Sequence, residues 1–161
     1  MNRVFISAED MLLPVWSEKL NAYTLKVLDQ MGISDWDLSI LLCTDKAMRQ
    51  LNRHYRNKDE STDVLSFELG VKEGGEDGNV RYVAGDVVIS LDTLRENSLY
   101  FKISEDEELR RLLIHGILHL SGMNHKTGRN TEPMIIRQEQ ILEKLKEESI
   151  LTNGKLFAEI E

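Results

Sequence analysis

The sequence of 161 residues has few of the features that direct proteins to oxidising compartments or membranes. It contains one cysteine, Cys43, so no disulfide can form within the chain. The opening stretch, MNRVFISAEDML, carries acidic residues where a secretory signal peptide needs an apolar stretch. The apolar run around 112–125 is shorter than the ~18 residues that a membrane-spanning helix requires. These absences predict a cytoplasmic protein with no membrane partner.

Positive charge is also in deficit. Lys and Arg number 20 against 28 Asp and Glu, which gives a net charge of −8. This balance offers no general attraction for nucleic acids, and we expect no DNA partner, although a local basic patch remains compatible with it. Apolar residues make up 41% and charged residues 30%, as in ordinary folded domains. The length predicts one domain over 1–161, with 149–161 as a loosely held tail.

The hydrophobic pattern predicts helices interspersed among strands. A glycine-rich and acidic loop over 70–79 is either a hairpin connection or a flap, and Gly85 is a candidate β-bulge. Asp45, Asp92 and Ser104 are expected to cap helices. The fold class is therefore α/β (α+β), with a single mixed sheet packed with helices. The expected helices cover 14–31, 45–56, 92–99, 104–121 and 131–148, and the expected strands cover 38–44, 64–69 and 80–90.

Three of the four histidines fall within eleven residues, at His115, His119 and His125. Residues four apart on a helix lie on the same face, so the first two imidazoles can bind one zinc ion. Gly122 is placed to end the helix and turn the chain, which can bring the third histidine to the same ion. Three protein ligands with an open fourth position are typical of catalytic zinc. The alternative is a buried helix whose histidines find ordinary hydrogen-bond partners, which is the commoner situation for any single histidine.

The spacing H-x₃-H-x₅-H matches that of the metzincin peptidases, HExxHxxGxxH, with one difference. The peptidases carry a glutamate after the first histidine as the general base, whereas this chain has Gly116. The pattern therefore predicts a zincin-like metal-binding helix, and peptidase activity would require an acidic residue from elsewhere in the chain.

Three segments together resemble one family. The run from His115 to His125, HGILHLSGMNH, is similar to the HGxLHLxGYDH motif of the YbeY endoribonucleases of bacterial rRNA maturation. Residues 51–67, LNRHYRNKDESTDVLSF, resemble that family's LNxxYRxxDxPTDVLSF pattern, and 84–90 resemble its GDIVIS strand. The order and spacing of these segments agree with the family over about 45–125. Departures are Met123 for Tyr, Asn124 for Asp and Ser61 for Pro.

The resemblance implies a zinc-dependent endoribonuclease specific for single strands, acting at the 3′ end of small-subunit rRNA and in ribosome quality control. It places the zinc ligands on His115, His119 and His125 and the functional arginine on Arg56. A planar, permanently charged guanidinium suits phosphate recognition, although an exposed arginine at a helix end is the ordinary alternative. The implied partners are single-stranded rRNA and the small ribosomal subunit with its proteins, which can supply the affinity that a net charge of −8 does not.

Two other functions stay open at this stage. Asn124 lacks the charge of the usual aspartate, and no general base can be named, so the chain could be a ribosome-assembly factor whose zinc is mainly structural. A metal-dependent hydrolase of another small substrate is the third alternative, and it would need an enclosed pocket. Arg49, Arg53, Arg56 and Lys58 are candidates for a local basic patch or for an ordinary solvated helix face. Asp63 is expected to cap or orient its turn, and His54 to be a surface helix residue and not a fourth ligand. Asp86 has no role that the sequence decides.

Overall fold

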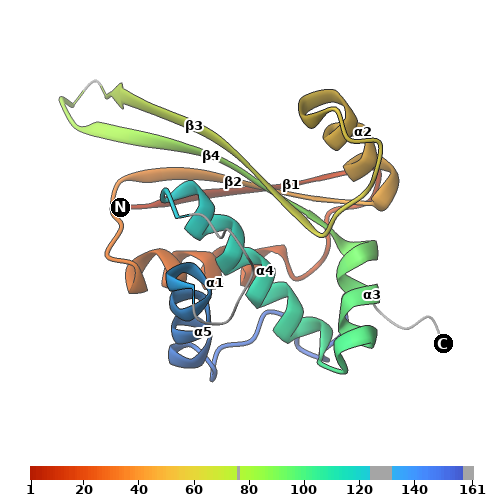
Figure 1. The fold of residues 1–161 in the computed structure, drawn as a ribbon. Helices are drawn as coiled ribbons and strands as arrows, with labels where there is room; N and C mark the ends of the chain where they lie inside the picture. Colours follow the sequence, from red (N-terminus) through yellow and green to blue (C-terminus); the bar gives the residue numbers. More distant parts are fainter. Residues whose placement is uncertain (76, 124–131, 158–161) are drawn as a thin grey trace.

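The computed structural model describes residues 1–75, 77–123 and 132–157. In this part of the chain a single four-stranded sheet is accompanied by five helices (Figure 1), which confirms the expected single mixed sheet packed with helices. The strand order is β1-β2-β4-β3, with β1, β2 and β4 parallel and β3 antiparallel to β4. The elements are β1 (Arg3–Glu9), α1 (Ser17–Gln30), β2 (Trp36–Cys43), α2 (Asp45–Arg56), β3 (Val64–Gly74), β4 (Val80–Ser90), α3 (Leu91–Phe101), α4 (Glu105–Leu120) and α5 (Pro133–Lys144).

The sheet separates two hydrophobic clusters of unequal size. Helices α1, α4 and α5 lie on one face of the sheet and α2 lies on the other (Figure 1). The larger cluster takes alternate residues of β2, Leu38, Ile40 and Leu42, all fully buried, as the two-residue period of a strand requires. The smaller cluster joins Met48 of α2 to Val88 of β4. Helix α4 is buried along most of its length, so its polar residues have positions set by packing.

The strand β1 is absent from the elements that the sequence pattern predicts. Only Val4 of its seven residues is buried, because β1 is an edge strand that pairs with β2 alone. A strand with one solvated side gives a weak hydrophobic signal. The alternation of Val4, Ile6 and Ala8 is the sequence feature that could have revealed it.

The glycine-rich segment after Leu69 is a hairpin connection and not a flap. β3 continues to Gly74, which pairs with Val80 of β4. The register shifts between Glu68 and Val71, opposite Gly85, which confirms the expected bulge. Gly85 has φ +133°, and an added Cβ would lie 2.0 Å from the carbonyl oxygen of Phe67, so only glycine fits there.

Two helix caps fall one and two residues before the expected Asp45 and Asp92. Thr44 accepts the hydrogen bond from the Ala47 amide at the start of α2, and Ser90 accepts that from Thr93 at the start of α3. The carboxylate of Asp45 accepts from the hydroxyls of Ser90, Thr93 and Ser61. Ser61 therefore holds its turn to the start of α2. Ser104 caps α4 as predicted, accepting from the Glu107 amide.

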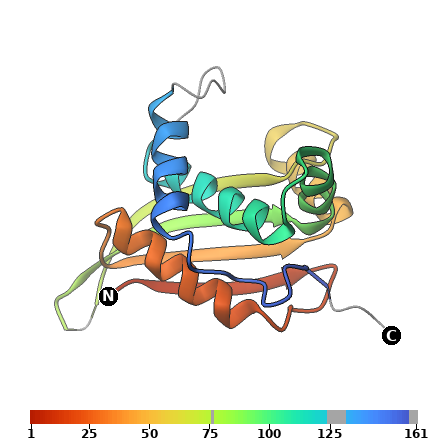
Figure 2. The same ribbon diagram turned by 90° about the horizontal axis from the view of Figure 1, so that it is seen from below.

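The expectation of a loose tail from 149 onward is wrong for the residues through Phe157. Ile150, Leu151 and Leu156 are at most 3% exposed, and the chain after α5 runs back along α1 (Figure 2). The Trp16 indole donates to the Leu156 carbonyl at 2.8 Å, and Asp106 of α4 accepts from the amides of Ile150 and Leu151. The carboxylates of Glu105 and Asp106 at the start of α4 therefore hold this segment in place. Residues 158–161 lie outside the described residues.

Among the described residues, no helix combines the length and apolar character needed to cross a membrane.

Candidate functional site

Two of the three predicted metal ligands lie together on α4. His115 and His119 are half-buried, and their Nε2 atoms are 3.2 Å apart. Two nitrogen ligands at 2.0–2.1 Å from a tetrahedral zinc ion are separated by about 3.3 Å. The two histidines therefore present their ring nitrogens at the spacing that one zinc ion needs.

The ring of His115 is oriented by a residue that the sequence analysis did not find. Its Nδ1 lies 2.7 Å from Oε1 of Gln138 on α5. A carbonyl oxygen can only accept, so Nδ1 carries the proton and the lone pair is on Nε2, toward His119. Metal-binding histidines are commonly oriented in this way by a hydrogen bond at the other ring nitrogen. Nothing in the spacing of 138 relative to 115 signals this contact, because it depends on how α5 packs on α4.

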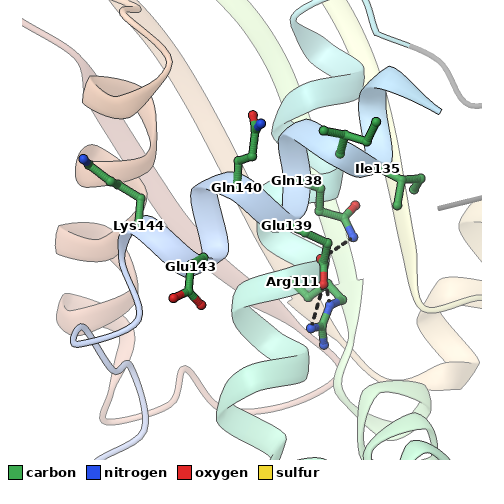
Figure 3. A pocket seen from close by; sticks show the side chains of 8 residues that line it. Arg111, Ile135, Gln138, Glu139, Gln140, Glu143 and Lys144 are labelled. Carbon is green, nitrogen blue, oxygen red and sulfur yellow. Dashed lines mark hydrogen bonds and ion pairs between the residues drawn. The ribbon is translucent and has the colours of Figure 1, made fainter. Parts of the chain in front are cut away.

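Gln138 belongs to a polar network across α4 and α5. Its amide donates to Glu139, and the guanidinium of Arg111 makes two hydrogen bonds to the same carboxylate (Figure 3). Glu107 accepts a further bond from Arg111. A hollow of about 1020 Å³ lies beside this network, lined by Arg111, Ile135, Ile136, Gln138, Glu139, Gln140, Glu143 and Lys144. Neither histidine lines this hollow. The network therefore acts on the site through the contact of Gln138 with His115.

The position after His115 has no room for the glutamate of the peptidases. Gly116 faces the sheet, and an added Cβ would lie 2.6 Å from Val87 of β4 and 3.3 Å from the Ser66 hydroxyl. That hydroxyl donates to the Gly116 carbonyl at 2.8 Å. The glycine is thus required by the close approach of α4 to the sheet, and a general base at 116 is excluded by packing.

Arg56 lies at the end of α2, across a cleft from the histidines. One guanidinium nitrogen donates to the Ser66 carbonyl at 2.9 Å, and the group lies over the Phe67 ring at 5.6 Å. In the described part of the chain it forms no ion pair, whereas Arg49 and Arg53 both pair with Asp59. The expected basic patch is therefore split: Arg49 and Arg53 share one carboxylate, whereas Arg56 pairs with no carboxylate of the described residues.

The cleft itself has a volume of about 1030 Å³ and joins the end of α2, the start of β3 and the histidine face of α4. Its cations are Arg56 and Lys58, and its carboxylates are Asp63 and Glu68. Asp63 accepts from the Val64 amide and the Asn97 side chain, which fixes the turn before β3. The complete lining is Tyr55, Arg56, Lys58, Thr62, Asp63, Val64, Leu65, Ser66, Phe67, Glu68, His115, His119 and Leu120.

Two residues that the sequence did not assign to the metal site lie away from the histidines. His54 is exposed and packs edge-on against Tyr55. Asp86 lines a different hollow with Ser39 and Phe67, on the α2 side of the sheet, and burial raises its pKa. Neither residue contributes to the histidine cleft.

The third predicted ligand, His125, lies outside the described residues, as does Asn124. Gly122 has φ +101°, as the predicted turn requires, and Met123 packs against the core. In ranges 1–75, 77–123 and 132–157, no group of three or more His, Cys, Asp or Glu side chains could hold a metal ion. The described part of the site thus supplies two ligands with suitable geometry.

Fold and site together define an α+β protein with a pair of histidines on one helix. Across an open cleft from this pair lies Arg56, which forms no ion pair with the described residues. The family model for "Endoribonuclease YbeY" matches residues 7–146. The chain belongs to the Endoribonuclease YbeY family.

Relatives with this description are similar over most of their length. A protein from Treponema pallidum is 45% identical over 142 residues, covering 88% of this chain and 89% of its own. That from Treponema denticola is 43% identical over 124 residues, covering 77% and 80%. A solution structure of a Thermotoga maritima protein matches with a TM-score of 0.60 and 26% identity, covering 91% of each chain. The chain therefore shares its fold with this solved structure over most of both chains.

Proposed function

We propose that this protein is a zinc-dependent endoribonuclease that cleaves single-stranded RNA. The observation that carries the proposal is the histidine pair, 3.2 Å apart, facing Arg56 across a cleft in a chain of the YbeY family. Its substrate would be rRNA near the 3′ end of the small-subunit rRNA, and its setting would be rRNA maturation and ribosome quality control in the cytoplasm.

The residues of the cleft have separable roles in this proposal. His115, His119 and His125 would hold one zinc ion, with Gln138 fixing the ring of the first. A bound zinc ion supplies Lewis-acid stabilisation of phosphoryl oxygens or a water of lowered pKa. Arg56 would bind the scissile phosphate, because its guanidinium can donate several hydrogen bonds and the Ser66 carbonyl takes one of them.

Deprotonation of the nucleophile is assigned to no side chain of α4. Packing excludes a carboxylate at 116. The two candidate nucleophiles are a water molecule and the 2′-hydroxyl of the RNA itself. A deoxynucleotide at the cleavage position distinguishes them, since it removes only the second.

The small ribosomal subunit and its proteins are the proposed partners. With a net charge of −8 and two of the four candidate basic residues paired to Asp59, the protein has little charge-based affinity for free RNA. A docking partner would supply the missing affinity and the choice of cleavage position.

A ribosome-assembly factor with a mainly structural zinc is the second candidate. The observation that favours it is that packing leaves no room for a carboxylate side chain at position 116. The cleft therefore lacks the general base that the zinc peptidases carry there.

Cleavage of single-stranded rRNA by the zinc-loaded protein separates the two candidates. We expect cleavage by wild type, none by a folded His119→Ala variant, and none by Arg56→Ala with its zinc retained. Loss of folding in His119→Ala, with no cleavage by wild type, would instead assign the zinc a structural role. Equal cleavage in all three proteins would indicate a contaminating nuclease and leave the proposal without support.

A further inference from the structure

Four planar side chains form a continuous row at the mouth of the histidine cleft. The guanidinium of Arg56 lies over the Phe67 ring, Phe67 contacts Tyr55 with centroids 5.3 Å apart, and Tyr55 contacts His54 at 4.6 Å. We call these four residues the planar row. It leads from the phosphate-binding residue of the proposed function out onto the surface of α2.

Tyr55 is an exposed member of this row and lies between Phe67 and His54. It is 63% exposed, although an aromatic ring of that size is usually buried at least in part. The edge-on contact with His54 and the tilted contact with Phe67 hold the ring from two sides. Its orientation is therefore set before any ligand arrives, which lowers the entropy lost on binding.

The row also joins two hollows. Tyr55 and Phe67 line the histidine cleft and, on their other side, a smaller hollow of about 320 Å³ that reaches Ser39 and Asp86 on the sheet. A volume of that size falls at the lower end of small-ligand sites. An RNA strand bound in the histidine cleft could therefore place one base against the rings of Tyr55 and Phe67, at the boundary between the two hollows.

We propose that Tyr55, supported by Phe67, is a base-stacking platform that binds one unpaired nucleobase of the RNA strand next to the phosphate held by Arg56. Aromatic faces stack on any nucleobase, and they require the base to be unpaired and splayed from its neighbours. The platform would thus make the cleft select single strands without relying on positive charge. The inference rests on the proposed RNA-cleaving function and deepens it by naming how the substrate strand is recognised.

The test is binding of a single-stranded RNA of about twelve nucleotides to the zinc-loaded protein, followed by fluorescence anisotropy in the cold. Each strand is checked on a gel afterwards to show that it is intact. We expect Tyr55→Ala to weaken binding roughly ten-fold and Tyr55→Phe to restore it, because stacking needs the ring and not the hydroxyl. Tyr100→Ala is the matched control, since Tyr100 is 80% exposed on α3 and lines neither hollow.

A second series locates the stacked base. Strands that carry a single abasic nucleotide at each position in turn are bound to wild type and to Tyr55→Ala. Stacking predicts that one position weakens binding to wild type and that this penalty disappears in Tyr55→Ala.

The outcomes separate this inference from the function on which it rests. Wild type that neither binds nor cleaves the single strand overturns both. Wild type that binds RNA, with Tyr55→Ala binding equally well or with additive abasic penalties at every position, overturns the platform alone. A duplex that binds as tightly as the single strand also contradicts it.

Discussion

His115 and Glu108 lie seven residues apart on α4, and each depends on a neighbour from another part of the fold. The imidazole of His115 has its proton placed by Gln138 of α5. The carboxyl of Glu108 is 3% exposed, and burial raises its pKa from 4.5 to about 7, assisted by the charge of Asp63. Packing therefore sets the ring orientation and tautomer of His115 and the pKa of Glu108, and residue type alone does not.

Gln138 is expected to tune zinc binding through His115. Replacing it by Ala removes the acceptor at Nδ1, so the ring loses its fixed orientation and tautomer. Loss of such an outer hydrogen bond typically weakens metal affinity roughly 10–100-fold. Competition with a fluorescent zinc chelator measures the change, and Gln140→Ala, an exposed residue of the same helix, is the control. Equal affinities for the two variants would contradict this role.

Glu108 makes stability depend on pH in a defined direction. Below pH 4.5 the carboxyl is protonated in both folded and unfolded chains, and its burial carries no charge penalty. As pH rises from 4.5 to about 7 the unfolded chain ionises before the folded one, so the free energy of unfolding falls, and the loss is complete once the folded carboxyl is ionised above about 7. Glu108→Gln should remove this loss, gaining up to about 3 kcal/mol above pH ~7 and much less near pH ~4.5. Urea unfolding across this pH range checks it, and parallel profiles for the two proteins would refute it.

At the scale of elements, α4 is the helix that carries both the core and the site. Ser104 starts it, Leu113, Ile114 and Ile117 bury one side, and the two histidines face the cleft. The close contact of Gly116 with Val87 sets how near the helix lies to β4. The distance between the histidines and Arg56 thus depends on residue 116 being a glycine.

Substitution of Gly116 tests this contact. Gly116→Ala improves helix propensity by ~1 kcal/mol, but its Cβ would meet Val87 at 2.6 Å. Because Val87 is fully buried and rigid at χ1, overpacking prevails and should lower the free energy of unfolding by about 1–3 kcal/mol. Gly74→Ala, with open space around it, should change stability little. Adding Val87→Ala should cost less in the Gly116→Ala protein than in wild type, and purely additive effects would count against the clash.

Sequence alone predicted the parts of this architecture that depend on local pattern. Short-range periodicity and capping chemistry predict the bounds of β4, the cap at Ser104 and the position of His115 and His119 on one face of their helix. Short-range pattern could not predict three other features, because each depends on contacts between residues far apart in the chain. These are the role of Gln138, the burial of Asp106 and the packing of the segment through Leu156. Tertiary packing decided those positions.

At the scale of the whole molecule, charge is distributed against general RNA binding. The net charge is −8, and Asp59 makes two hydrogen bonds to Arg49 and lies 3.7 Å from Arg53. Arg56 and Lys58 are the cations left in the cleft lining. Affinity for a free strand should then come from few phosphate contacts, with stacking and a docking partner supplying the rest.

The salt dependence of RNA binding tests this distribution directly. For single strands the slope of log K against log salt is about −0.7 per phosphate contact, so two contacts predict about −1.4 for wild type. Asp59→Asn frees Arg49 and Arg53, and it should raise affinity and steepen the slope by up to about 1.4. Glu143→Gln removes the same charge from a remote ion pair with Lys146, so it should change neither quantity appreciably. Anisotropy titrations between low and moderate salt give both slopes. If Glu143→Gln strengthened binding as much as Asp59→Asn, net charge and not the local pairing at α2 would govern affinity, and the cleft could no longer be described by two phosphate contacts.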